Sequence, residues 1–329
     1  MAKVATVGVV GRTNAGKSTL VNALVGEKVS IVSPVEQTTR NTVRGIVSEE
    51  RGQLVLMDTP GLHKAVGELG RLLNRMARRS AAGVDVVCVV FDAGDEPRME
   101  DVGWMQRVAR ERPEKVLFVL NKADRAPFYE RMFRDAWEEV NRETGNGEQG
   151  TGNREQGTGN GEQGTGNGDR VEPKWVKCIA STPGGAKSVL DALFDLAEEG
   201  ELLFDEDTVT DYPRRLAIAD SIREKYLAKM HQEVPHELGV LVKRIDESER
   251  GGRRIWQIAV DVLVNRESQK PIVIGRGAET VKYVRKCAER EVSEMFGVKA
   301  EMELWVKVEP GWMKNKRLLA EMGYLGGLV

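Results

Sequence analysis

The stretch that most constrains the fold is "GRTNAGKST" at residues 11–19, which lies between an apolar run and a helical pattern. It matches G-x-x-x-x-G-K-[ST], a glycine-rich turn that leads from a strand into a helix. Glycine lets backbone N–H groups turn inward around phosphate oxygens, and the N-terminus of the helix adds a positive dipole. Because the pattern stands between a strand and a helix, we prefer a phosphate-binding loop to an ordinary glycine-rich turn.

The end of this loop predicts how phosphates and a metal ion would be held. Lys17 is expected to reach the β- and γ-phosphates, and the Ser18 hydroxyl can ligate Mg²⁺. The loop residues that we expect to contact a nucleotide are Gly11, Asn14, Ala15, Gly16, Lys17, Ser18 and Thr19.

A phosphate loop alone does not distinguish GTP from ATP, but "NKAD" at 121–124 does. It stands at the end of an apolar run, where open α/β sheets bind their ligands. A carboxylate can accept hydrogen bonds from N1–H and the exocyclic amine of guanine, whereas adenine offers the opposite pattern. We therefore expect Asp124 to read guanine, with Asn121 and Lys122 supporting the base and the loop. Taken alone the motif could be a helix N-cap, and its pairing with the phosphate loop favours guanine.

Two further motifs supply candidates for the metal and the γ-phosphate. "DTPG" at 58–61 ends a strand-like run, so Asp58 can hold Mg²⁺ through water and the Gly61 N–H can meet the γ-phosphate. "QTTR" at 37–40 offers hydroxyls that could ligate Mg²⁺ only when GTP is bound. Dependence of a loop on the γ-phosphate is how nucleotide switches work.

The first part of the chain alternates β-branched runs with helical patterns, which predicts a mostly parallel α/β sheet. The connection at 50–52 is too short for a crossover, so the second and third strands should form an antiparallel hairpin. The expected strands are 4–10, 42–50, 53–58, 84–93, 115–124 and 174–180.

A Gly-rich block with a seven-residue repeat, at about 145–168, interrupts this pattern. It has no apolar residue to form a coiled-coil seam, so we expect a flexible insertion within the domain. The acidic run that follows the sheet ends in proline and suggests a boundary. We predict a first domain at 1–200, a linker at 201–212 and a second domain at 213–329.

Composition and charge narrow the class of protein. The chain has 329 residues, 40% of them hydrophobic and 30% charged, with a net charge of −2, as in soluble globular proteins. The 3 cysteines are scattered, which argues for a reducing compartment and against a disulfide or zinc framework. The most apolar run, 84–91, is far shorter than the roughly 20 residues of a membrane span. We expect a cytoplasmic monomer, with peripheral membrane contact left open.

The second domain shows a different pattern. A helix fits 213–231, alternating strands fit 238–248 and 253–266, and a further strand fits 300–309. Between them, "VIGRGAETV" at 273–281 reads as an apolar strand entering two glycines. A helix follows, with an apolar face. Its expected members are Val281, Val284, Ala288, Val292 and Met295.

Three interpretations of "VIGRGAETV" compete: a dinucleotide fingerprint, a loop that grips a nucleic-acid backbone, and an ordinary turn. A dinucleotide fingerprint requires a third glycine where Thr280 stands, and it opens a βαβ unit. The preceding strands look antiparallel instead, which disfavours that interpretation. Lone tryptophans in this part, Trp256, Trp305 and Trp312, are expected to lie in the core rather than to stack on bases.

The order of the motifs GRTNAGKS, QTTR, DTPGLH and NKAD resembles that of the translation-factor-related GTPases. "QTTR" with "DTPGLH" is specifically similar to the Era family of bacterial ribosome-assembly GTPases, and so is the tail "ELWVKVEPGW…LAEMGY". The likeness covers nearly the whole chain except the Gly-rich insertion. It implies hydrolysis of GTP to GDP with Mg²⁺. The implied catalytic residues are Lys17, Thr39, Asp58 and Gly61, and the implied metal ligands are Ser18, Thr39 and Asp58.

The resemblance also implies how fast GTP is hydrolysed and which monovalent cation activates the site. Thr39, with Thr38 beside it, matches the switch threonine. Leu62 stands where Ras-like proteins carry a water-positioning glutamine, so intrinsic hydrolysis should be slow. Asn14 matches an asparagine that helps related GTPases hold K⁺, which suggests activation by K⁺. The fifth motif of the family reads Ser-Ala, and here Ala180 and Ser181 stand in swapped order as candidates to contact guanine O6.

For the second domain the resemblance implies an α+β KH-type fold that binds RNA. In KH domains a GxxG loop allows the nucleic-acid backbone to approach two helices closely. The aligned loop is Gly275-Arg276-Gly277-Ala278, so its fourth position departs from the pattern. The candidate RNA-binding residues are Gly275, Arg276, Gly277, Ala278, Lys282 and Arg285.

The implied partners are the 3′ end of 16S ribosomal RNA and the 30S subunit, whose maturation the protein would assist, and the inner face of the cell membrane. Two alternatives stay open. The chain could be an RNA-binding scaffold with little or no turnover, or a GTPase that acts on transfer RNA or at a membrane.

Overall fold

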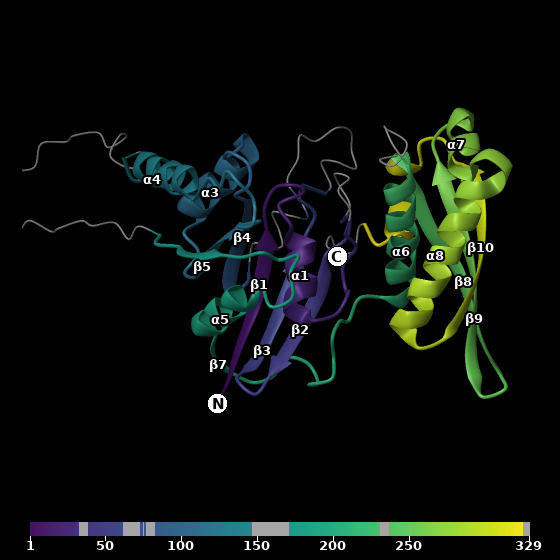
Figure 1. The fold of residues 1–329 in the computed structure, drawn as a ribbon, viewed down its shortest axis with the longest axis horizontal. Helices are drawn as coiled ribbons and strands as arrows, with labels where there is room; N and C mark the ends of the chain where they lie inside the picture. Colours follow the sequence, from purple (N-terminus) through teal and green to yellow (C-terminus); the bar gives the residue numbers. More distant parts are fainter. Residues whose placement is uncertain are drawn as a thin grey trace, which may run out of the picture.

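The computed structural model describes residues 1–32, 39–61, 73–74, 76, 83–146, 171–230 and 237–324. Within these residues the chain forms two sheets, each with its own helices, that lie side by side and are joined by a single extended segment (Figure 1). The predicted Gly-rich insertion lies outside the described residues beyond position 146. Among the described helices none is long and apolar enough to cross a bilayer.

The first sheet has strand order β2-β3-β1-β4-β5-β6, with β7 paired to β1. Neighbouring strands are parallel except in the β2–β3 hairpin and the β1–β7 pair, so the predicted mostly parallel sheet with an early hairpin is confirmed. The strands are β1 (Ala2–Val10), β2 (Val43–Glu49), β3 (Gly52–Asp58), β4 (Val86–Asp92), β5 (Val116–Asn121), β6 (Lys174–Lys177) and β7 (Glu198–Gly200).

Helices cover both faces of this sheet, because its central strands are apolar on both sides. One face packs against α1 (Lys17–Val25) and α5 (Lys187–Leu196). The other packs against α3 (Met99–Glu111) and α4 (Glu130–Asn146), where Trp104 and Phe133 are buried. The phosphate-loop motif, "NKAD" and "DTPG" all follow carboxyl ends of strands, so the fold gathers them at one edge of the sheet.

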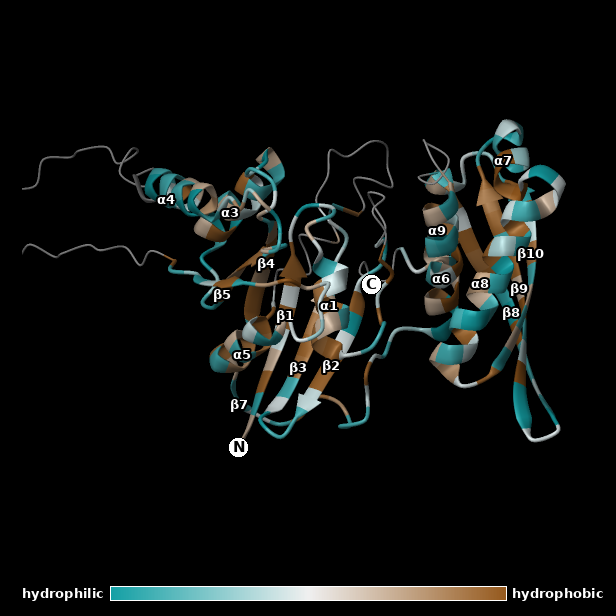
Figure 2. Ribbon diagram, in the orientation of Figure 1, coloured by the Kyte–Doolittle hydropathy of each residue, from teal (hydrophilic) through white to brown (hydrophobic). Residues whose placement is uncertain are grey.

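The second sheet has strand order β10-β9-β8, with β8 antiparallel and β10 parallel to β9. Helices α6 and α8 lie on one of its faces (Figure 2). The apolar side chains between these helices and the strands form a separate core. The elements are α6 (Arg214–Lys229), β8 (Gly239–Arg250), β9 (Arg253–Val264), η3 (Glu267–Gln269), α7 (Lys270–Ile274), η4 (Arg276–Ala278), α8 (Glu279–Phe296), β10 (Lys299–Val308), η5 (Trp312–Lys314) and α9 (Lys316–Glu321).

Three expectations for this part were wrong. The apolar run before the glycines is the short helix α7 rather than a strand, because Pro271 fits the start of a helix and only Val273 of this helix is buried. On α8, Met295 is 39% exposed and Phe296 packs against the core instead. Trp256 and Trp312 are buried as expected, whereas Trp305 is 60% exposed on the strand at the sheet edge.

The segment between the two sheets is hydrogen-bonded to the first sheet. Residues 198–200 form β7 on β1, and the Gln53 side chain accepts from Leu203 N and Phe204 N at 2.9 and 3.0 Å. Farther along, Ile46 N on the outer strand β2 donates to Val209 O at 2.8 Å. We still propose the boundary at 201–212, but these residues follow the hairpin edge of the first sheet (Figure 1).

Candidate functional site

The loop between β1 and α1 has room only for glycine at two of its positions. Gly11 has φ +148°, and a Cβ there would lie 2.3 Å from Val90 O. Gly16 has φ +95°, and its Cβ would lie 2.2 Å from Asn121 Nδ2. Any larger residue would displace the neighbouring strand or the "NKAD" loop, so the motif's glycines are required by close approach as well as by their backbone angles.

Lys17 places a buried cation in the middle of the loop. Its Nζ donates to Arg12 O at 2.8 Å. Burial lowers the pKa of Lys17 to about 8; Asp58 raises it, and Arg12 lowers it further. A phosphate group beside Nζ would favour the charged form and relieve this cost of burial.

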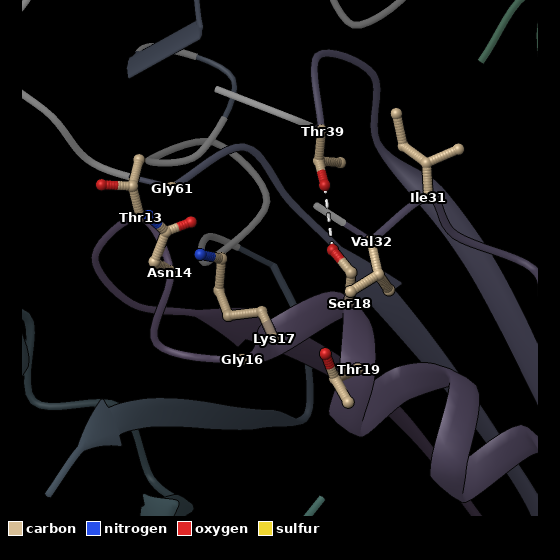
Figure 3. A pocket seen from close by; sticks show the side chains of 10 residues that line it. All are labelled: Thr13, Asn14, Gly16, Lys17, Ser18, Thr19, Ile31, Val32, Thr39 and Gly61. Carbon is tan, nitrogen blue, oxygen red and sulfur yellow. Dashed lines mark hydrogen bonds between the residues drawn. The ribbon is translucent and has the colours of Figure 1, made fainter. Parts of the chain in front are cut away.

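A cavity of about 430 Å³ opens over Lys17 (Figure 3). A Cβ on Gly61 would lie 2.7 Å from Thr13 N and 2.9 Å from Lys17 Nζ, so the backbone of Gly61 comes close to the loop. The "DTPG" motif therefore forms one wall of the cavity beside Lys17. The residues that line the cavity are Thr13, Asn14, Gly16, Lys17, Ser18, Thr19, Ile31, Val32, Thr39 and Gly61.

Three oxygen-bearing side chains meet the requirements of a magnesium site. The hydroxyl oxygens of Ser18 and Thr39 lie 2.9 Å apart (Figure 3). Neighbouring ligands of octahedral Mg²⁺ at 2.0–2.1 Å are separated by about the same distance. Asp58 is fully buried, and neither of its carboxylate oxygens has a hydrogen-bond partner among the described residues. Burial raises the pKa of Asp58, and the nearby Ser18 and Lys17 lower it. A cation would relieve this buried carboxyl, so the donor set fits Mg²⁺.

Asn121 connects the phosphate loop to the fifth motif. Its Nδ2 donates to Ala15 O at 2.9 Å, and its Oδ1 accepts from Ala180 N at 3.1 Å and from Cys178 Sγ at 3.3 Å. Lys122 Nζ in turn donates to Asn14 O at 2.8 Å. Both residues therefore hold the phosphate loop, and their role toward the base stays a prediction.

Asp124 is exposed at the same edge of the sheet, where a purine could reach its carboxylate. The swapped fifth motif follows β6. Because Ala180 N–H already donates to Asn121, Ser181 is the better candidate to supply an N–H to guanine O6. Ala180 and Ser181 also line a cavity of about 960 Å³ together with Thr19 of α1, a residue that lines the phosphate cavity as well.

Sequence reasoning missed Arg12, the second residue of the phosphate loop. It is 6% exposed, and its guanidinium lies 3.1 Å from Asp101, 3.4 Å from Asp95 and 3.5 Å from Asp92. Asp92 also pairs with Lys122 at 2.5 Å. Arg12 thus anchors the loop that holds Lys17 to β4 and α3. The motif leaves this position undefined, and its acidic partners are far away in the sequence, so no local pattern indicated the contact.

The Gly275–Ala278 loop lies between α7 and α8. A Cβ on Gly275 would lie 2.3 Å from Thr280 Oγ1, so this glycine is required by packing within the loop. Gly277 has φ +58° with open space around it. Ala278 also adopts a left-handed conformation, with φ +62°, which favours glycine.

Charged side chains surround this loop. Arg276, Lys282 and Arg285 are exposed, and Lys282 Nζ donates to Gly277 O at 3.3 Å. Arg276 and Lys282 therefore lie at the loop, whereas Arg285 stands farther along α8 and lines a cavity with residues of β8, β9 and β10. Two other predicted positions, Thr38 and Leu62, lie outside the described residues.

Comparisons with protein families match both parts of the chain. Residues 6–122 match the family described as 50S ribosome-binding GTPase, and residues 233–313 match the KH domain. The GTPase Era of Crocosphaera subtropica is 31% identical over 97% of this chain and 91% of its own length. The GTPase Era of Caldanaerobacter subterraneus subsp. tengcongensis is 33% identical over 97% of this chain and 96% of its own.

Two solved structures are also similar over nearly their whole length. Era in complex with MgGDPNP and nucleotides 1506–1542 of 16S ribosomal RNA superposes with a TM-score of 0.83 at 29% identity, covering 98% of this chain and 99% of that one. An Aquifex aeolicus Era variant bound to GDP·AlF₄⁻ superposes with a TM-score of 0.82 at the same identity and coverage. By sequence, domain content and fold, this chain belongs to the Era family of GTPases.

Proposed function

We propose that the protein is a GTP-hydrolysing switch that binds the 3′ region of 16S ribosomal RNA and assists maturation of the 30S subunit. The observation that carries the nucleotide half is the cavity in which Lys17, Ser18, Thr39 and Gly61 converge. A cation, two hydroxyls and a closely approaching backbone are the groups that phosphoryl transfer requires.

The site residues divide the work of hydrolysis. Lys17 binds the β- and γ-phosphates, and the Gly61 backbone contacts the γ-phosphate. Bound Mg²⁺ would neutralise charge that develops on the phosphates, and Ser18, Thr39 and, through water, Asp58 would hold it. Asp124 reads the guanine edge and Ser181 N–H meets O6. A water molecule then attacks the γ-phosphorus directly, without a covalent intermediate on the protein. The bond from the γ-phosphorus to the β–γ bridging oxygen breaks, so GDP and inorganic phosphate leave, and the phosphate keeps the oxygen of the water.

The RNA half of the proposal is supported by the KH-domain match and by the solved relative that contains a 16S RNA fragment. In this chain the loop before α8 exposes Arg276, and Lys282 follows on the first turn of the helix. These cations can pair with phosphates, while Gly277 leaves open space for a nucleic-acid backbone.

Phosphate release and RNA crosslinking test this function together. Wild-type protein should release phosphate from GTP, and Lys17→Ala should reduce the rate to background, whereas Lys316→Ala on exposed α9 should leave it unchanged. Crosslinking to total RNA should recover fragments from the 3′ end of 16S RNA with GTP and fewer with GDP. An RNA-binding scaffold without turnover would crosslink but release no phosphate, and recovery of transfer RNA alone would refute the ribosomal target.

We further propose that K⁺ activates the site through Asn14, which lines the phosphate cavity and whose own φ is +61°. Single-turnover hydrolysis should be faster in K⁺ than in Na⁺ at equal ionic strength. Equal rates in the two salts would refute this part and leave the rest of the function intact.

A further inference from the structure

Two residues that line the phosphate cavity, Val32 and Thr39, are both tied to the second domain. The backbone N–H of Val32 donates a hydrogen bond to a side chain of helix α6. Thr39 is followed by Arg40 and Asn41. Their side chains donate hydrogen bonds to backbone carbonyl groups of the second domain, Arg40 to Leu238 O and Asn41 to Met322 O. We call the part of the cavity near Ser18 and Thr39, where Mg²⁺ would bind, the metal end of the site. The metal end is therefore held by contacts with the second domain.

The contact of Val32 is made with a carboxylate on α6. Val32 N donates to Glu224 Oε1 at 3.0 Å, and Glu224 is only 6% exposed. Lys28 Nζ lies 2.6 Å from Glu224 and 2.6 Å from Glu291 of α8. Lys225 contacts the same two carboxylates, so two lysines and two glutamates close a ring between the domains.

The contacts after Thr39 are also buried. Arg40 is fully buried, and its Nη1 donates to Leu238 O at 2.9 Å. Asn41 Nδ2 donates to Tyr212 Oη at 2.9 Å, and Tyr212 Oη donates to Asp220 Oδ2 of α6 at 2.8 Å. Asn41 and Tyr212 thus form a chain of hydrogen bonds that ends on α6, one turn before Glu224.

Burial makes these contacts specific. Arg40 and Asp220 can lie in the interior only where their charges have partners, because an unpaired buried charge is costly. A displacement of α6 would separate Asp220 from Tyr212 and Glu224 from Val32. Helix α6 therefore favours one position for Val32 and Thr39 relative to Ser18.

We propose that Glu224 and Tyr212, through their contacts with Val32 and with Asn41, are positioning residues that hold the metal end of the nucleotide site in place. This proposal rests on the proposed GTP hydrolysis and adds to it a role for the RNA-binding half of the chain. Neither residue lines the phosphate cavity, so each acts through the residue that it holds.

Single-turnover GTP hydrolysis by the full chain across a Mg²⁺ titration tests the proposal. Glu224→Ala removes the acceptor of Val32 N–H, and we expect the half-saturating Mg²⁺ concentration to rise about tenfold, the usual effect of losing a hydrogen bond to a buried charged group. Glu224→Gln keeps an oxygen acceptor and should recover part of the loss. GDP affinity without Mg²⁺ should stay within about twofold, because Lys17 and the guanine loop are untouched. Glu294→Gln, an exposed carboxylate on α8, is the matched control.

Tyr212→Phe is the second variant, because it keeps the ring and removes only the hydroxyl between Asn41 and Asp220. We expect its half-saturating Mg²⁺ concentration to rise at least about threefold. If the wild-type protein hydrolyses GTP and a folded Glu224→Ala or Tyr212→Phe variant keeps the wild-type Mg²⁺ dependence, the positioning role is refuted. Absence of hydrolysis in the wild-type protein would instead refute the proposed function.

Discussion

The hydroxyl oxygens of Ser18 and Thr39 lie 2.9 Å apart, although the two residues come from different elements 21 positions apart in the sequence. Ser18 is at the start of α1, and Thr39 lies in the segment before β2. The separation equals that of neighbouring ligands around octahedral Mg²⁺, and the buried carboxylate of Asp58 completes the set. In the proposed function, this pair makes Mg²⁺ binding depend on the segment that carries Thr39.

Replacing Thr39 tests that dependence. In Thr39→Ala we expect the half-saturating Mg²⁺ concentration for GTP hydrolysis to rise about tenfold or more, because one direct ligand is lost. Thr39→Ser keeps the hydroxyl and should stay close to the wild type. Equal Mg²⁺ dependence in Thr39→Ala and Thr39→Ser would contradict a ligand role for the hydroxyl.

Specificity for guanine is expected to reside in the Asp124 carboxylate. Asp124→Asn replaces an acceptor with an amide, which can donate to the O2 of xanthine. We therefore expect GTP affinity to fall about 100-fold or more and XTP affinity to rise. In the variant, the N1–H and amine of bound guanine would lose their acceptor, and a site discriminates strongly against a base whose polar groups stay unpaired. Competition binding with the two nucleotides measures the switch. Unchanged preference for GTP would remove Asp124 from the base site.

Asn121 is expected to hold the two nucleotide loops together through its amide. Asn121→Asp places an acceptor against Ala15 O, where Nδ2 now donates at 2.9 Å. We expect the free energy of unfolding to fall by about 2–3 kcal/mol, because a buried acceptor then faces another acceptor. Urea unfolding followed by circular dichroism measures it. Asn315→Asp is the matched control, because the Asn315 side-chain oxygen accepts from Arg317 N and Leu318 N, as a carboxylate oxygen also can.

Ala278 holds a left-handed conformation at φ +62°. Ala278→Gly removes the steric cost of that conformation, and we expect the second domain to gain about 0.5–1 kcal/mol of stability. Ala278→Val should lose stability, because a β-branched side chain tolerates this region less well. RNA binding by Ala278→Gly should be equal or tighter, because the substitution removes the Ala278 methyl group, which the RNA backbone would otherwise approach. Weaker RNA binding than the parent would contradict a backbone-gripping role for the loop.

Removal of residues 148–168 tests the Gly-rich insertion. Helix α4 ends at Asn146 and β6 begins at Lys174, so the deletion spares every described element. We expect GTP affinity within about twofold of the wild type and a melting temperature within about 2 °C, because a long polar loop adds little to stability. Loss of folding in the shortened chain would show that the insertion is structural.

Local patterns predicted much of the fold and of the site. The parallel strands, the early hairpin and the loop at the end of β1 follow from apolar periodicity and turn length. The motifs at 11–19, 58–61 and 121–124 each stand at the carboxyl end of a strand, and parallel strands place such ends at one edge. For this reason a linear sequence was enough to predict that Lys17, Gly61 and Asn121 come close together.

Where a residue's environment depends on distant partners, the sequence was not enough. Trp305 has the apolar character of a core residue, yet it is 60% exposed on the edge strand β10, whereas Ala300 and Met302, on the other face of that strand, are buried in the core. The run before the glycines was expected to be a strand, yet it forms the helix α7, in which only Val273 is buried. The type of a side chain indicates whether it favours burial, and the packing of the neighbouring elements decides whether it is buried.

The sequence by itself determined that the chain has a phosphate loop, a guanine motif and a second domain, because each is written in contiguous residues whose geometry is local. Only the tertiary structure decided that Arg12 anchors the phosphate loop to acidic residues of β4 and α3, and that Glu224 of α6 holds Val32. These partners lie about 80–190 residues apart, and their pairing depends on burial, which raises the cost of an unmatched charge. No spacing rule encodes such contacts, since they form only when separate elements are packed together.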